Sequence, residues 1–175
     1  TKDFHSRYNA VKAVGELSTK NDAALKTLAS ALKDPFFRIR MKALSSLDLS
    51  DAKQAKILLS EVEKLASKDP KTLVQAAAIS ALAKTKNTKY LPLFEKGINA
   101  VSNAVKSSSL AAIASLEPQK VVGILDRVEL TNASEDTIIK LLPIIVEHKV
   151  AKHREAIGSM VAFYPFIKFQ NPELG

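Results

Sequence analysis

The sequence predicts an all-α protein, a solenoid (superhelix) of stacked antiparallel helix pairs that repeat about every 33 residues. Three observations predict this fold class: a short residue pattern recurs four times, apolar residues between its copies follow helical spacing, and the composition favours helix. Trp is absent and only 6% of residues are aromatic, so the core must be built from Leu, Ile, Val and Ala. Long aliphatic segments rich in Ala prefer helix to strand.

The recurring pattern has a long polar residue, a small residue three positions later and an aliphatic residue four positions after that. Its successive copies are offset by 33, 35 and 31 residues. The small and aliphatic residues share one helix face, where the small residue lets a neighbouring helix approach to about 8–10 Å. We expect these residues to occupy equivalent positions in four stacked helices, with the small and aliphatic ones buried: Arg7, Ala10, Val14; Arg40, Ala43, Leu47; Gln75, Ala78, Leu82; Lys106, Ser109, Ile113.

The partner helices of these segments lie between the copies of the pattern. Apolar residues at positions i, i+3, i+4 and i+7 predict amphipathic helices there. Two are long and two are shorter, and they cover residues 22–33, 51–66, 90–98 and 118–128.

Beyond residue 130 the repeat becomes harder to follow. Residues 135–147 and 150–163 still show helical patterns, although Pro143 should kink or break the first of these helices. The β-branched content of segment 121–130 leaves a strand as the alternative there.

Several helix starts carry capping signals. Asp34 and Asp69 each precede a Pro, so we expect each Asp to be an N-cap with the Pro at the first helical position. Weaker signals are Glu117 before Pro118, the pair Asp51 and Gln54, which resembles a capping box, and Ser134.

The chain is interpreted as a single domain over residues 1–175. Residues 3–116 hold the clear repeats, and residues 117–175 hold diverged repeats and a C-terminal cap. Because the chain starts at Thr1, without Met and within a repeat, we expect it to be an excerpt of a longer protein. The absence of Cys excludes disulfides and Cys-ligated zinc but does not fix the compartment.

Charge and polar motifs indicate no chemistry within the chain. The net charge of +8 can attract nucleic acid, but the Lys residues are spread along the chain without Trp or an Arg cluster, so we expect neither a nucleic-acid nor a membrane partner. His148 and His153 are five residues apart, which points their rings apart on a helix, and no zinc-binding His-Glu-x-x-His motif is present. We expect no catalytic residue, no metal ligand and no cofactor in this chain.

The C-terminal segment contains an aromatic cluster. It is formed by Phe163, Tyr164, Phe166 and Phe169. We expect these rings either to cap the last helix pair or to form a docking surface for an adjacent domain.

The segment from Asp34 to Leu47 resembles the second helix of a HEAT repeat. The family pattern is Asp-Pro, then an aliphatic residue, Arg, and Ala three residues later. Two segments match it: Asp34, Pro35, Ile39, Arg40 and Ala43, and then Asp69, Pro70, Val74 and Ala78 with Gln75 in place of Arg.

Together with its aromatic tail, the chain also resembles the C-terminal HEAT-like domain of bacterial M1-family zinc aminopeptidases. That resemblance implies a non-catalytic domain that covers the active site of an upstream catalytic domain and limits substrate access. Zinc would then belong to the parent protein, because the family's catalytic signatures are absent from this sequence. The alternatives are a stand-alone scaffold that binds a protein or peptide and, as a third choice, a nucleic-acid-binding HEAT-like protein.

Overall fold

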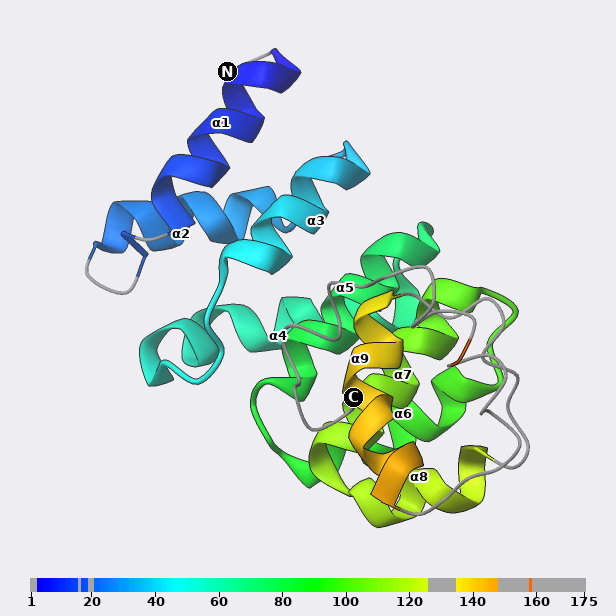
Figure 1. The fold of residues 1–175 in the computed structure, drawn as a ribbon. Helices are drawn as coiled ribbons and strands as arrows, with labels where there is room; N and C mark the ends of the chain where they lie inside the picture. The colour runs from blue at the N-terminus through cyan, green and yellow to red at the C-terminus, as the bar shows by residue number, and fades with distance from the viewer. Residues whose placement is uncertain (1–2, 16, 19–20, 126–134, 148–157, 159–175) are drawn as a thin grey trace.

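The structure is a computed structural model that describes residues 3–15, 17–18, 21–125, 135–147 and 158 (Figure 1). Within these residues the regular elements are helices, and no strand is present. In chain order they are α1 (Phe4–Gly15), α2 (Asp22–Ala31), α3 (Phe37–Ser46), α4 (Ala52–Lys68), α5 (Thr72–Ala83), the 3-10 helix η1 (Thr88–Tyr90), α6 (Leu91–Ile98), α7 (Asn103–Leu116), α8 (Pro118–Leu125) and α9 (Glu135–Glu147).

The helices form two rows. The second helices of the pairs, α1, α3, α5, α7 and α9, each pack against the next one in the row. The first helices, α2, α4, α6 and α8, pack against the second helix of their own pair. Successive pairs follow one another from α1 at the top of Figure 1 to α8 at the bottom, so the predicted all-α solenoid of stacked helix pairs is confirmed.

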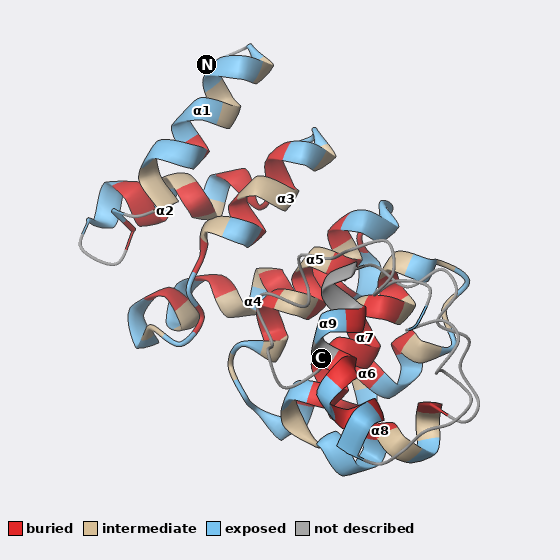
Figure 2. Ribbon diagram, viewed as in Figure 1, coloured by how far each residue is buried: buried red, intermediate tan, exposed pale blue. Residues whose placement is uncertain are grey.

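The core lies between the two rows and continues from pair to pair (Figure 2). Leu and Ile supply all of the largest fully buried side chains except Phe94, in agreement with a composition poor in aromatic residues. Each such side chain stabilises the fold by about 1.5–3 kcal/mol relative to an exposed one. A single helix pair cannot bury its apolar faces by itself, so the stability of the stack depends on contacts between neighbouring pairs.

The prediction that Asp34 and Asp69 are N-caps is wrong. Helices α3 and α5 begin three residues after these Asp residues, and their N-caps are Phe36 and Lys71, which form no side-chain capping hydrogen bond. The Asp34 carboxylate instead accepts a hydrogen bond from the Phe36 N–H, and the Asp69 carboxylate accepts one from the Lys71 N–H, each at 2.8 Å. The Pro residues therefore lie in the turn before each helix.

The structure confirms some of the other predicted helix signals and contradicts others. Asp51 is the N-cap of α4 and accepts a hydrogen bond from the Gln54 N–H, but the Gln54 side chain accepts from the Asp48 N–H and does not complete a capping box. Helix α8 begins at Pro118, as the Glu117 signal suggested, and its residues 121–125 are helical, so no strand forms there.

Helix α9 continues through Pro143 to Glu147, so the predicted break does not occur. A proline removes one intrahelical hydrogen bond, but tertiary packing can offset that loss. In α9 the buried residues Ile138, Leu141, Ile144 and Ile145 lie on both sides of the proline and belong to the common core. Of the predicted helix over 150–163 the structure describes only residue 158, which is helical, and the cap signal at Ser134 lies outside the described residues.

Candidate interaction surface

The turns inside the helix pairs are held by ion pairs to the preceding pair. Arg40 in α3 donates two hydrogen bonds to the Asp69 carboxylate, from Nε to Oδ2 at 2.8 Å and from Nη2 to Oδ1 at 2.9 Å. The same guanidinium donates through Nη1 to the backbone carbonyls of Asp34 and Pro35 at 2.8 and 3.1 Å. One side chain therefore joins the turn of its own pair to the turn of the next pair.

The same kind of ion pair occurs one helix pair earlier in the chain, but Gln75 replaces the arginine one helix pair later. Arg7 in α1 donates from Nε to Oδ2 of Asp34 at 2.8 Å, although this ion pair is less buried than the one at Arg40. At the equivalent position of α5, Gln75 donates only to the backbone carbonyl of Asp69, at 2.6 Å. An amide has no charge and cannot replace a guanidinium in a bidentate ion pair. Gln75 therefore makes only the counterpart of one Arg40 contact, the hydrogen bond to a backbone carbonyl in the turn of its own pair.

The small residues of the repeat occupy unequal environments. Ala43, Ala78 and Ser109 are fully buried, whereas Ala10 is exposed, against the expectation of an equivalent buried position. A Cβ placed on Gly97 of α6 would lie 2.9 Å from the Ser109 Cβ, so this position faces the first helix of its own pair. The described residues contain no such helix before α1, and this explains why Ala10 is exposed.

The other predicted repeat residues range from buried to half-buried. Leu47, Leu82 and Ile113 are buried in the core, while Val14 is half-buried on α1. Of the long polar residues, Arg40 is buried, and the other three are half-buried: Arg7, Gln75 and Lys106. The aromatic residues Phe163, Tyr164, Phe166 and Phe169 lie outside the described residues, so both interpretations of that cluster stay predictions.

Two polar contacts lie at the end of the helix pairs opposite the turns that hold Asp34 and Asp69. The sequence did not predict them. Gln54 is buried and donates from Nε2 to the Ser18 Oγ at 3.1 Å, while its Oε1 accepts from the Asp48 N–H at 2.9 Å. These bonds connect the α1–α2 and α3–α4 connections with α4. A Gln at the third position of a helix looks like a capping residue in sequence, so only the fold reveals this use.

Charged and aromatic groups meet between α4 and α6. The Tyr90 hydroxyl donates to the Glu63 Oε1 at 2.6 Å, and the Lys89 Nζ lies 3.0 Å from the same oxygen. The Tyr90 hydrogen bond, followed by that of Lys89, holds the pKa of Glu63 below its usual value. Burial and then the Glu63 contact raise the pKa of Tyr90. The cluster links α4 to the turn before α6, because Tyr90 and Lys89 share the Glu63 Oε1.

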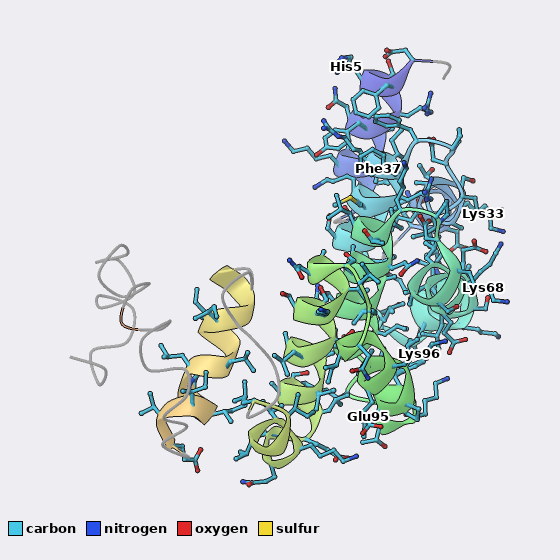
Figure 3. The ribbon with its side chains drawn as sticks, turned by 90° about the vertical axis from the view of Figure 1, so that its right-hand side faces the viewer. His5, Lys33, Phe37, Lys68, Glu95 and Lys96 are labelled. Carbon is cyan, nitrogen blue, oxygen red and sulfur yellow. The ribbon has the colours of Figure 1, made fainter. Side chains whose placement is uncertain are left out.

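The outward side of the second-helix row, where Ser45 is exposed, is a candidate surface. We call this the second-helix face; its residues in the middle of the helices are Lys42 and Ser45 on α3, Ala77 and Ser80 on α5, and Ser108 on α7. The Ser80 and Ser108 hydroxyls are 3.4 Å apart, so adjacent helices meet there through small side chains. In Figure 3 these helices run down one side of the array, and α8 and α9 bend toward that side.

Helices α1, α3, α5 and α7 contain no Asp or Glu over their described spans, from Phe4–Gly15 to Asn103–Leu116. The acidic residues inside the helices before α9 are instead on the first helices: Asp22 on α2, Glu61 and Glu63 on α4, and Glu95 on α6. The two rows therefore differ in charge, and the second-helix face is neutral to basic.

The described residues offer no assembled chemical centre. They contain no group of three or more His, Cys, Asp or Glu side chains that could hold a metal ion. None of the described helices is both long and apolar enough to cross a bilayer. His148 and His153 lie outside the part of the chain that the structure describes.

Comparison with known proteins gives one match. A family model described as HEAT repeats matches residues 26–114, which is just over half of the chain and extends from α2 into α7. No curated protein and no solved structure matches the chain significantly. Nothing in this comparison supports the expected origin in a bacterial M1-family aminopeptidase, and the aromatic tail that suggested it is outside the described residues.

Proposed function

Because the chain belongs to the HEAT-repeat family, we propose that it is a non-catalytic scaffold that binds a protein partner on its second-helix face. The observation that carries this proposal is the separation of charge and size between the two rows of helices. The second helices α1, α3, α5 and α7 present small and basic side chains without any acid, while the acids of the helices before α9 lie on the first helices. A partner can therefore approach that face closely without meeting negative charge.

Rigidity supports the same role. A binding surface that spans several helix pairs is useful only if the pairs keep a fixed spacing, because ordering them on binding would cost affinity. The buried Arg40–Asp69 pair and the half-buried Arg7–Asp34 pair each join two successive turns. Bidentate Arg–carboxylate contacts of this kind hold geometry better than Lys contacts do.

Site-specific photo-crosslinking tests the proposal in the protein that contains this chain. A photoreactive amino acid replaces Ser45, which is exposed on α3, and in a second variant it replaces Lys56, which is exposed on α4. We expect a protein partner to be captured from Ser45 and not from Lys56. We also expect Lys42→Glu on the second-helix face to reduce the capture, while Lys56→Glu leaves it unchanged.

Two results would contradict the proposal. Equal capture from both positions would show that the second-helix face is not selective. Capture of only a peptidase domain of the same polypeptide would favour the aminopeptidase role. A third measurement, aminopeptidase activity of the isolated chain with zinc, should give no turnover if the chain is non-catalytic.

A further inference from the structure

Exposed apolar side chains lie at the same edge of three successive helix pairs. Phe36 is 38% exposed, Leu73 is 49% exposed and Val101 is 99% exposed. Phe36 is the N-cap of α3, Leu73 lies in the first turn of α5, and Val101 precedes Ser102, the N-cap of α7. We call this region the turn edge, because it is formed by the turns inside the pairs α2–α3, α4–α5 and α6–α7.

Cations lie at the same three turns. Lys33 follows α2, while Lys68 and Lys96 are in the last turns of α4 and α6. Figure 3 views this side of the molecule and shows the three lysines following one another along the array. All three are exposed, and among the described residues Lys33 has only a 3.8 Å contact to Glu61, while Lys68 and Lys96 form no ion pair.

The acids of these turns do not neutralise the edge. Asp34 and Asp69 have side chains that are only 10% and 2% exposed, and their carboxylates bind Arg7, Arg40 and backbone N–H groups. Lysines near the ends of first helices could merely complement the helix dipole. That explanation does not account for an exposed apolar residue at each of the same turns, although the Phe36 ring also packs against Phe4 and Phe37.

The spacing of the turns fits an extended polypeptide. The turns that carry the apolar residues lead into neighbouring packed helices, and such helices are about 8–10 Å apart. A polyproline-type chain rises about 3.1 Å per residue with three residues per turn, so every third side chain recurs on one side after about 9 Å. We propose that the turn edge binds an extended acidic segment of a partner protein that carries an apolar side chain at every third residue.

This site differs from the second-helix face, so the two proposals stand or fall separately. Nucleic acid fits the edge less well, because base stacking requires exposed aromatic rings and only Phe36 among the three apolar residues is aromatic. An anionic membrane would also attract the lysines, but it would not discriminate between spacings of apolar residues. These differences define the probes of the test.

The test uses a fluorescent peptide with four Leu-Glu-Pro repeats, which places Leu at every third position of an extended chain. Control peptides replace Leu with Ser, or insert one extra Glu per repeat to change the spacing to four residues. Binding is followed by fluorescence anisotropy and by amide NMR shifts. We expect the first peptide to bind more tightly than either control, with the largest shifts at residues near Leu73 and Val101.

Matched variants locate the site. The double variant Leu73→Ser, Val101→Ser should weaken binding at least about fivefold, since two apolar contacts are lost. Ile57→Ser is the control, because Ile57 is 51% exposed on α4 and lies away from the turns. Lys68→Glu with Lys96→Glu should weaken binding by a similar factor, while Lys56→Glu should not.

Circular dichroism melting of each variant checks that it folds. We expect every variant to fold, because each changed side chain is exposed. Absence of peptide binding up to about 1 mM, a weak affinity on the scale of protein complexes, would overturn the proposal. Equal binding of the three- and four-residue spacings would overturn it too. So would tighter binding of duplex DNA or of phosphatidylserine vesicles that is lost in the same lysine variants.

Discussion

The Arg40 guanidinium and the Asp69 carboxylate lie side by side with two parallel hydrogen bonds of 2.8 and 2.9 Å, although 29 residues separate them in the chain. Both side chains are almost fully buried, with 10% and 2% of their surface exposed. Loss of one partner would leave a buried charge without compensation. The pair is therefore the clearest place to test how the stack holds together.

Arg40→Met is expected to destabilise the fold by about 3–5 kcal/mol, because Asp69 would then be a buried, unpaired carboxylate. The measurement is the free energy of unfolding in urea. The double variant Arg40→Met, Asp69→Asn should recover part of that loss. Arg7→Met is the matched control: its ion pair with Asp34 is more exposed, so its effect should be smaller. An effect at Arg7 as large as that at Arg40 would contradict this account.

Ser109→Ala is expected to leave stability unchanged or to raise it by about 1 kcal/mol. The Ser109 hydroxyl is fully buried and has no hydrogen-bond partner within the described part of the chain, so removing it removes a desolvation cost. Thermal melting provides the measurement. A clear decrease in melting temperature would mean that the hydroxyl is satisfied in solution.

Gly97→Ala is expected to destabilise the fold by about 1–3 kcal/mol, since the new Cβ would overlap the Ser109 Oγ and overpack the α6–α7 contact. Combining it with Ser109→Ala should reduce the loss but not abolish it, because the Ser109 Cβ is also close, at 2.9 Å. Gly123→Ala in α8 is the control. Among the described residues a Cβ there meets nothing within 4 Å, so helix propensity predicts a gain of about 0.5–1 kcal/mol.

Ala78→Leu is expected to cost about 1–3 kcal/mol, because Ala78 is fully buried and a larger side chain must push α5 away from its neighbours. The exposed Ala10 at the equivalent position of α1 supplies the control, and Ala10→Leu should change stability by no more than about 0.5 kcal/mol. The comparison uses unfolding in urea. Equal costs at the two positions would show that α1 packs against a further helix in solution.

Tyr90→Phe is expected to cost about 0.5–1.5 kcal/mol at neutral pH, through loss of the hydrogen bond to Glu63. The Glu63 pKa is lowered in the fold from its ordinary value of 4.5, so its stabilising effect is present above that pH and is lost as pH falls through the lower, folded-state value. The stability difference between wild type and variant should therefore shrink in acid. A difference that stays constant from neutral pH down to strong acid would contradict the role of Glu63.

Much of the fold was predictable, because its signals are local. The apolar spacing along α2 and α4 follows the helical period. The Arg40–Ala43 pattern places an ion-pairing side chain and a small packing side chain on one helix. The start of α8 at Pro118 also followed from the sequence. In contrast, Pro143 did not end α9, because burial on both sides of it outweighed the local preference.

The sequence by itself determined the helical pairs and their repeat, since side chains three and four residues apart report directly on the helix that carries them. Only the tertiary structure decided that Asp34 and Asp69 serve the neighbouring pairs rather than cap their own helices, and that Phe36, Leu73 and Val101 stay exposed along one edge. The physical reason is distance along the chain. Burial, ion pairing and exposure depend on which segments some 30 residues away pack alongside, and neither helical spacing nor capping preference contains that information.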